Sequence, residues 1–203
     1  MTKQIKYLKQ IVPHLEEKYG KEQTQKIITK ALSRYDEIIF ENKDEPKEHY
    51  MHTRQRIYPA IAVFDTMISE GINRQEVADF LVDYYKWRAS GLEPMIKTLF
   101  RIPGLYKLVP KVFYNMTQKS FGPQMGFQSK DKYLSNTEMR FNMVKCPYFE
   151  KCKQYGCPEI VKGFCDADDI CYGHMHPKLS WDRTKTLGYG DDVCDFGIHI
   201  KEC

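Results

Sequence analysis

The segment "CDADDICYGHMH", residues 165–176, gathers side chains that bind metals or move protons. They are Cys165, Asp166, Asp168, Asp169, Cys171, His174 and His176. A cysteine can attack an electron-poor carbon, and carboxylates and imidazoles can act as general acids or bases. The same residue types are also common ligands of zinc and iron. The segment is therefore a candidate reaction centre or a candidate metal site.

The spacing of the cysteines argues against the metal site. Successive cysteines are separated by 5, 4, 7, 5, 22 and 8 residues, so the chain has no C-x-x-C pair of the kind found in zinc sites and iron–sulfur loops. The "HMH" at 174–176 lies between Gly173 and Pro177, which suits a surface loop or a pocket rim. We expect no metal and no cofactor, and we expect most cysteines to be small core residues.

A helix over residues 158–172 would bring the thiol and one carboxylate to the same side. Six side chains share that face: Val161, Phe164, Cys165, Asp168, Cys171 and Tyr172. Because a buried carboxylate without a partner is costly, Asp168 should face a cation, either a ligand or the side chain of Arg183 or Lys185. Asp169 lies one turn beyond the thiol and can reach the edge of a cleft.

The elements that must position these residues fall into two parts. Residues 1–122 are predicted to be a helical region, because apolar residues return at helical spacing. One stripe consists of Ile27, Ile28, Ala31, Leu32, Tyr35, Ile38 and Ile39. Gly20 and Gly71 mark helix ends, and Asn73 with Glu76 resembles a capping box that opens the next helix.

Residues 123–203 are predicted to form a Cys-rich α+β domain of catalytic type. Alternation at Met139, Phe141 and Met143 indicates a strand, paired with the extended run 127–134 through a turn at 135–136. Two short helices follow, and the segments 178–188 and 192–201 are predicted as strands. The order ββααββ favours an α+β fold with a four-stranded antiparallel sheet behind an N-terminal helical region.

Length and charge exclude several classes of protein. The chain has 203 residues, 42% of them hydrophobic, and a net charge of +4, which is too small to indicate nucleic-acid binding. Its uncharged runs are far shorter than a membrane span, and residues 1–10 lack the apolar core of a secretory signal. We therefore expect a cytoplasmic protein with reduced cysteines and no stable membrane insertion.

The charge is distributed unevenly along the chain. From Cys146 onward seven Lys and Arg face ten Asp and Glu, whereas residues 1–145 carry 24 against 17. The stretch 96–120 contains five basic residues, no acid, several aromatics and two prolines. It suits either a lid over a pocket that admits an anionic substrate, or a surface that lies on an acidic membrane or partner.

The C-terminal motifs resemble those of the L-2-amino-thiazoline-4-carboxylic acid hydrolase family. The resemblance runs from about Phe141 to Ile200, through "CPYFEKCKQYGCPEIVKGFCDADD" and "LSWDRTKTLGYGDDVCDFGIHI". The matching residues are Cys146-Pro147-Tyr148, Gly156, Pro158-Glu159, Cys165, Asp168, Asp169, Arg183-Thr184, Thr186-Leu187, Gly190 and Cys194-Asp195-Phe196. The last strand also resembles small-ligand domains of the vinyl-reductase type, which supports the fold more than any activity.

The resemblance implies that water adds to the amidine carbon of a cyclic isothiourea and that the ring C–S bond opens to give N-carbamoyl-L-cysteine. Asp168 would pair with the amidinium, and Arg183 would hold the substrate carboxylate. Cys165 would attack the carbon with His174 or Asp169 as the base, or Asp169 would activate a water for direct attack.

Other assignments of the same residues stay open. Thr186, Cys146 and Cys194 are further candidates for substrate binding, and any of the three motif cysteines could be the reactive thiol. A different function, a zinc, iron–sulfur or small-ligand binding or sensing module built from the Cys and His cluster, is the alternative. The expected partner is a small anionic substrate, and a homo-oligomer is possible.

Overall fold

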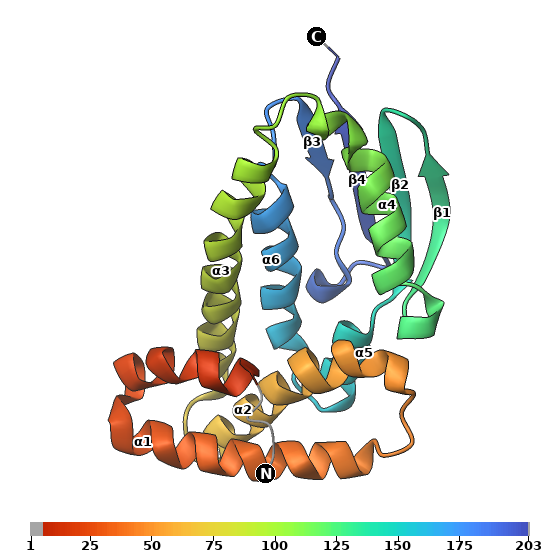
Figure 1. Ribbon diagram of the computed structural model, residues 1–203. Coiled ribbons are helices and arrows are strands. Elements are labelled where there is room, and N and C mark those ends of the chain that lie inside the picture. The colour runs from red at the N-terminus through yellow and green to blue at the C-terminus, as the bar shows by residue number, and fades with distance from the viewer. Residues whose placement is uncertain (1–5, 203) are drawn as a thin grey trace.

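The computed structural model describes residues 6–202. Its first helix, α1 (Lys6–Glu41), is broken at Gly20, whose backbone angles (φ 77°, ψ 165°) are open only to glycine. The predicted end of a helix at Gly20 is therefore confirmed, and α1 forms two arms that meet at a sharp turn (Figure 1). The predicted stripe packs inward, since Ile27, Ala31 and Ile38 are fully buried.

Two short turns connect α1 to the most apolar helix. Lys47–Met51 form a 3-10 turn, η1, and Thr53–Ile57 form a single π-helical turn, η2. The helix α2 (Tyr58–Ser69) follows directly, and nine of its twelve residues are buried. π-helical turns often occur at functional sites because they displace side chains from the regular helical face.

Helix α3 (Arg74–Leu99) begins at the predicted cap. The side chain of Asn73 accepts hydrogen bonds from the amides of Gln75 and Glu76, which satisfies two donors of the first helical turn. Along its length α3 packs against α6 (Val161–Tyr172), and Figure 1 shows the two helices side by side. The short helix α5 (Pro147–Gln154) and the 3-10 turn η5 (Pro158–Ile160) lead into α6.

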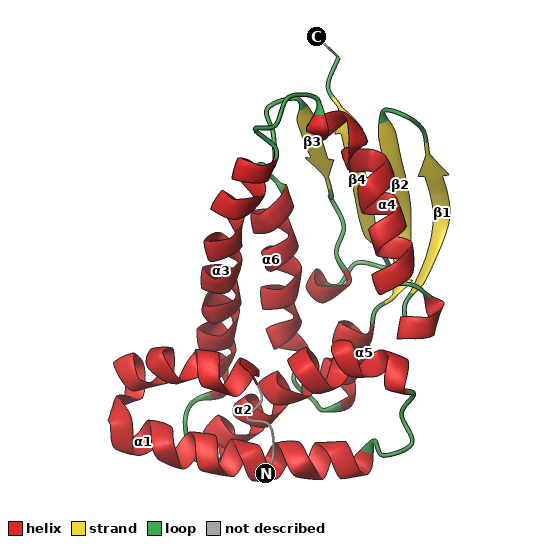
Figure 2. Cartoon of the chain, viewed as in Figure 1, coloured by secondary structure: helices red, strands yellow, loops and turns green. Residues whose placement is uncertain are grey.

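The sheet has four antiparallel strands in the order β1-β2-β4-β3, and the predicted α+β fold is confirmed. The strands are β1 (Gln128–Leu134), β2 (Glu138–Lys145), β3 (Leu179–Asp182) and β4 (Cys194–Ile200). Ser135 closes the β1–β2 hairpin, where its hydroxyl accepts from the amides of Thr137 and Glu138. Helix α4 (Val109–Ser120), which follows the 3-10 turn η3 (Leu105–Leu108), packs against β2 and β4 (Figure 2).

The third strand is shorter than its alternating sequence predicts. Alternation continues from Leu179 to Leu187, but β3 ends at Asp182. The carboxylate of Asp195 accepts from the amides of Thr184 and Lys185 at 2.8 and 2.5 Å, so these amides bond to a side chain instead of a neighbouring strand. Residues after β3 therefore leave the sheet and lead to the 3-10 turn η6 (Leu187–Tyr189).

One buried cluster connects the helical part with the sheet. It runs from Tyr7 and Ile27 in α1 through Leu81 in α3 to Phe141 and Ile198 in the strands. In Figure 2 the paired helices α3 and α6 stand on one side, and α4 with the sheet stands on the other. No helix within residues 6–202 is long and apolar enough to cross a membrane.

Candidate functional site

A cavity of about 380 Å³ is lined by α3 and α6, by α4 and the sheet, and by the π-helical turn η2. Its lining is rich in aromatic side chains: Tyr85, Phe113, Phe121, Phe127, Phe141, Tyr148, Phe164, Tyr172, Trp181 and Phe196. Its polar lining side chains include Arg56, Arg88, Cys146, Cys165, Asp168, Arg183 and Cys194. A largely apolar hollow with a few convergent polar groups is the usual form of a small-molecule site.

Asp168 is the acidic group of this cavity. It lies deep in the molecule, yet 43% of its side-chain surface is accessible, because the carboxylate faces the hollow. Burial raises the pKa of Asp168 to about 7, with a further increase from the nearby charge of Asp169, while Arg183 and Arg56 oppose the shift. A carboxyl group that titrates near neutral pH can take up and release protons during a reaction.

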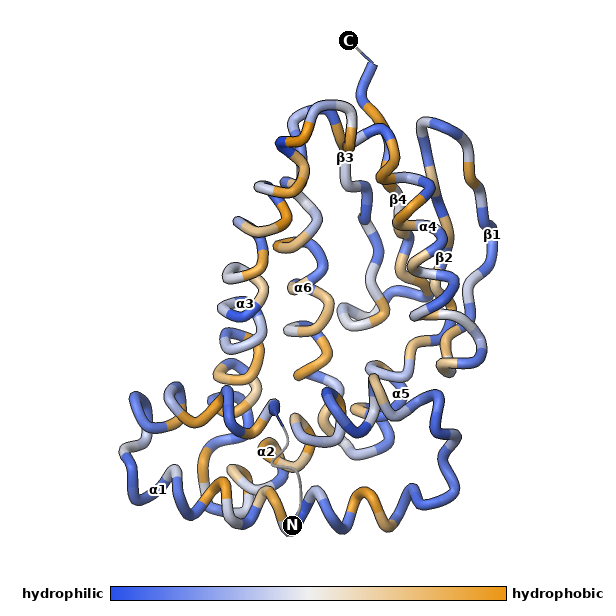
Figure 3. The backbone as a smooth tube through the Cα atoms, viewed as in Figure 1, coloured by the Kyte–Doolittle hydropathy of each residue, from blue (hydrophilic) through white to orange (hydrophobic). Residues whose placement is uncertain are grey.

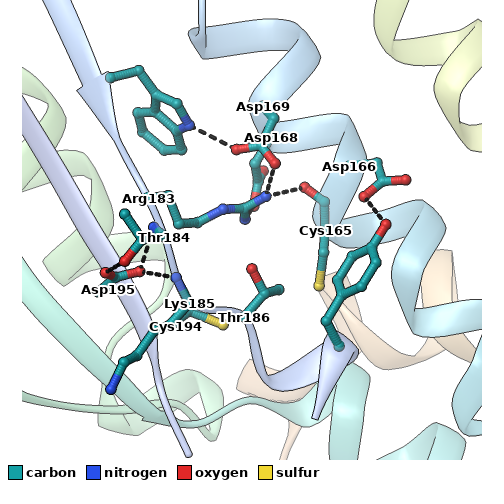
Figure 4. Close-up of polar contacts among 12 residues, drawn as sticks. Cys165, Asp166, Asp168, Asp169, Arg183, Thr184, Lys185, Thr186, Cys194 and Asp195 are labelled. Carbon is teal, nitrogen blue, oxygen red and sulfur yellow. Dashed lines mark hydrogen bonds and ion pairs between the residues drawn. The ribbon is translucent and has the colours of Figure 1, made fainter. Parts of the chain in front are cut away.

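The predicted internal cation of Asp168 is Arg183. Its Nη1 lies 3.5 Å from Oδ2 of Asp168, and its Nη2 donates to Asp169 and, at 2.8 Å, to the carbonyl oxygen of Cys165 (Figure 4). The side chain is only 2% exposed. Nη2 of Arg183 is thus held by Asp169 and a backbone carbonyl, whereas Nη1 is buried beside Asp168 and makes no hydrogen bond within residues 6–202.

Asp169 contacts two side chains of the cavity lining, Trp181 and Arg183. Its Oδ1 accepts from the indole nitrogen of Trp181 at 2.8 Å, and its Oδ2 pairs with Arg183. Asp169 does not line the cavity, and it is exposed. Its contacts suit a positioning residue that fixes the guanidinium beneath Asp168.

Four thiols line the cavity: Cys171, near the end of α6, and three thiols at motif positions on three elements. Cys165 lies one turn before Asp168 on α6, Cys146 precedes α5, and Cys194 begins β4. Burial raises the pKa of each thiol, for Cys146 to about 12; neighbouring thiols add to the increase for Cys146 and Cys165, and the charges of Asp168 and Asp195 add to it for Cys194. Each thiol therefore needs a base or a bound cation before it can act as a thiolate.

Gly188 lets the chain of η6 approach the thiol of Cys165. A Cβ at position 188 would lie 2.8 Å from the sulfur of Cys165 and 3.0 Å from Cγ1 of Val161. A residue with a side chain fits here only if the side chains of Cys165 and Val161 or the helix α6 shift. The sequence marked the neighbouring Leu187 and Gly190 but gave no signal for this position.

Arg56 is a cavity residue that the sequence analysis missed. It lies on η2, where its Nη1 donates to the hydroxyl of Tyr148 at 3.4 Å, and among residues 6–202 it has no carboxylate partner. Its sequence context is that of an ordinary surface arginine before an apolar helix. Only the fold brings its charge to the cavity that Asp168 lines.

A buried histidine holds Tyr148 in position. Nε2 of His52 lies 2.7 Å from the carbonyl oxygen of Ser120, so this nitrogen must carry the proton and donate it. Nδ1 then accepts from the hydroxyl of Tyr148 at 3.1 Å. Burial lowers the pKa of His52 to about 4, which keeps the ring neutral at physiological pH. The hydroxyl of Tyr148 is therefore oriented to accept from Arg56.

Besides Asp169, two of the predicted site residues lie outside the cavity lining. His174 is exposed and does not line the cavity. Thr186 is buried outside the lining, where its amide donates to Asp191 at 2.7 Å. Asp166, expected on a solvated surface, accepts from the hydroxyl of Tyr189 and pairs with Lys86.

The described part of the chain has no group of three or more His, Cys, Asp or Glu residues arranged to hold a metal ion. No histidine appears in the cavity lining. The lining combines one acid, Asp168, with four thiols and three arginines.

The family model of L-2-amino-thiazoline-4-carboxylic acid hydrolase matches residues 50–198. The chain belongs to this hydrolase family. The match includes η2, α2, α3 and α4 as well as the C-terminal motifs, so it extends much further toward the N-terminus than the sequence resemblance that begins near Phe141. Arg56 and Asp168 both lie inside it. No curated protein matches the chain.

Solved structures give only distant matches. An H-NOX protein from S. oneidensis, in the Fe(II)NO ligation state, has a TM-score of 0.35 at 11% identity and covers 96% of this chain and 97% of its own. An Fe(II) unliganded H-NOX protein from K. algicida has a TM-score of 0.32 at 14% identity, with coverage of 97% and 95%. TM-scores of this size do not establish a shared fold.

Proposed function

We propose that the protein is a hydrolase that opens a cyclic isothiourea such as L-2-amino-thiazoline-4-carboxylate to N-carbamoyl-L-cysteine. The observation that carries the proposal is the carboxylate of Asp168, which faces the cavity one helical turn from the thiol of Cys165, with a pKa near 7. Membership of the family supports the same reaction class.

The first role of Asp168 is to act as the base. It takes the proton from the Cys165 thiol, whose sulfur then forms a bond to the amidine carbon. The ring C–S bond breaks, and the substrate sulfur leaves as a thiol with the proton that Asp168 returns. The product of this step is an isothiourea carried on the Cys165 sulfur.

The second step uses water. A water molecule that is deprotonated by Asp168 adds to the same carbon, and the bond to the Cys165 sulfur breaks to restore the thiol. The carbon then carries an oxygen, and N-carbamoyl-L-cysteine is released. The overall change is the addition of one water molecule, with no oxidation or reduction. Direct attack by a water activated by Asp168 is the competing path.

The carboxylate of the substrate is assigned to Arg56. Its planar guanidinium is held by Tyr148, lines the same cavity as Asp168 and has no acidic partner within residues 6–202. Arg183 then has the role of holding Asp168 and Asp169. The substrate contact that the family resemblance implied for Arg183 is the alternative, since its Nη1 lines the cavity region without a hydrogen bond within residues 6–202.

The test is incubation of the purified protein with L-2-amino-thiazoline-4-carboxylate, with release of the thiol and the mass of N-carbamoyl-L-cysteine as readouts. Asp168→Asn should lower kcat/KM at least about 100-fold, because the base is lost. Asp166→Asn is the matched control, since Asp166 lies on the same helix outside the cavity, and it should keep activity.

The covalent step has its own test. Cys165→Ala should abolish turnover, whereas Cys157→Ala, a buried cysteine outside the cavity lining, should retain it. Full activity in Cys165→Ala would remove the thiol step and leave direct attack by water. Absence of turnover by the folded wild-type protein would reject this substrate.

A further inference from the structure

The cavity is larger than the substrate that gives the family its name. An apolar cavity of roughly 150 Å³ accepts benzene, with six carbon atoms, so a cavity of 380 Å³ has room for roughly fifteen non-hydrogen atoms. The ring of 2-amino-thiazoline-4-carboxylate with its substituents has nine. Space for a group of about the size of a phenyl ring therefore remains.

The two walls of the cavity differ in chemistry. The charged lining groups lie on η2, α3 and α6 and directly after β3: Arg56, Arg88, Asp168 and Arg183. The opposite wall, formed by α4 and β2, carries no charged side chain in the lining; Phe113, Met116 and Phe141 lie there. A ligand that fills the hollow must be polar at one side and apolar at the other.

We propose that the preferred substrate is an isothiourea carboxylic acid that bears an apolar substituent of about phenyl size, and that α4 and β2 bind this substituent. The inference rests on the proposed hydrolase function, because the polar end is placed by the same Asp168 and Arg56. Burial of the substituent against apolar side chains favours the larger substrate over the parent compound.

The experiment compares 2-amino-thiazoline-4-carboxylate with its 2-benzylamino derivative in one assay, since both release a thiol. We expect kcat/KM to be roughly tenfold or more higher for the benzyl compound. Thr117→Phe, which fills the apolar wall from α4, should remove this preference. Gln118→Phe, the adjacent position outside the lining, should leave it unchanged.

Calorimetry with the Asp168→Asn variant measures binding of both compounds without turnover. Together with turnover by the wild type, it separates the substrate preference from the proposed hydrolase function. Turnover of the parent with no gain for the benzyl compound overturns the inference and leaves the hydrolase proposal standing. Tight binding of the benzyl compound without turnover by the wild type supports the ligand class and contradicts the hydrolase. Binding of neither compound overturns both.

A second, independent observation concerns the outer surface beside the cavity. Among residues 6–202 twelve large apolar side chains are exposed, and eight of them lie within residues 87–116. These eight, which we call the apolar rim, are Trp87, Leu92, Met95, Leu99, Ile102, Leu108, Val112 and Met116. Exposed apolar residues that gather in this way mark interaction surfaces.

The apolar rim follows helical spacing on two elements. On α3 three rim residues recur at intervals of three and four: Leu92, Met95 and Leu99. Three more recur every four residues from the turn before α4 into that helix: Leu108, Val112 and Met116. Leu92 and Met116 also line the cavity, so the two stripes meet at its mouth. In Figure 3 hydrophobic and hydrophilic residues alternate along both helices.

The charges beside the rim select its partner. Residues 87–120 carry six basic side chains, Arg88, Lys97, Arg101, Lys107, Lys111 and Lys119, and one acid, Glu93, which pairs with Lys97 at 2.7 Å, so the segment has a net charge of +5. Two copies of this surface would repel each other, whereas an anionic lipid surface would attract it and accept the apolar side chains. We propose that the apolar rim docks reversibly on an anionic membrane surface, with the mouth of the cavity toward the lipid.

The test is co-sedimentation with vesicles of phosphatidylcholine alone or mixed with phosphatidylserine. We expect binding to the mixed vesicles only, weakened by salt. The double variant Leu99→Glu and Val112→Glu, at rim positions outside the cavity lining, should reduce binding at least about tenfold. Phe40→Glu, an exposed apolar residue far from the rim in sequence, is the control and should bind normally.

Two results would overturn the docking proposal. One is equal binding of the wild type and the double variant to mixed vesicles. The other is a change from dimer to monomer in the double variant without any change in vesicle binding, which would show that a second copy covers the rim.

Discussion

Oδ2 of Asp168 lies 3.5 Å from Nη1 of Arg183, while the stronger hydrogen bonds of the same guanidinium go to Asp169 and to the backbone of α6. The arginine therefore neutralises the region without fully capturing the carboxylate that faces the cavity. Because the hydrogen bonds of Arg183 go to other groups, the pKa of Asp168 stays raised although a permanent cation lies beside it. Both the rate and the stability of the protein should therefore depend on pH.

The rate should depend on the protonation of Asp168. Because the base must be ionised and its pKa is about 7, kcat/KM should fall about tenfold per pH unit below pH 7. Asp169→Asn removes a charge that raises this pKa, so the acid limb should move to lower pH. The measurement is the pH profile of both proteins with one substrate, which cancels the titration of the substrate itself. An unmoved limb would contradict the role of Asp168.

Asp168 should also make stability depend on pH. Its pKa in the folded protein, about 7, lies above the value of about 4 in an unfolded chain, so the folded state binds the proton more tightly. The resulting stabilisation is present at low pH and is lost as pH rises from about 4 to about 7. In urea titrations Asp168→Asn should lack this loss, while Asp166→Asn should behave like the wild type.

Gly188 should tolerate no side chain while Cys165 keeps its sulfur. Gly188→Ala places a Cβ 2.8 Å from that sulfur and should lower the free energy of unfolding by about 1–3 kcal/mol. Combination with Cys165→Ala should recover part of the loss, because the clashing atom is removed. The measurement is a double-mutant cycle from denaturant unfolding. Strict additivity would show that the strain lies elsewhere, for example at Val161.

Arg56 should affect substrate binding more than chemistry. Arg56→Ala removes the proposed carboxylate contact and should raise KM about tenfold or more, with a smaller change in kcat. Arg88→Ala is a useful comparison, because Arg88 lines the cavity from α3 rather than from η2. An equal loss in both variants would point to general attraction of the anion rather than to a specific contact.

The sequence predicted the parts of this structure that depend on local periodicity. Helical spacing placed Cys165 and Asp168 on one inward face of α6, and the capping residue Asn73 marked the start of α3. The pairing of Asp168 with Arg183 was also among the expected alternatives, because a buried acid requires a cation.

The features that the sequence did not predict arise from contacts between distant segments. The end of β3 depends on Asp195, and the sequence alternation after Asp182 carries no sign of that carboxylate. Arg56 enters the site only because η2 packs beside α5, where Tyr148 receives its hydrogen bond. Neither contact is indicated by the residues that neighbour it in the sequence.

The arginine on η2 and the aspartate on α6 come from the first and the last third of the chain, and they line one cavity only where these segments pack together. A fragment that stopped before the first strand would carry Arg56 without its acid, and a fragment that began there would carry Asp168 without its partner helix α3. Binding competence should therefore arise late in folding, in one step with the docking of α6 on α3. During synthesis the nascent chain would be inert until its last third had emerged.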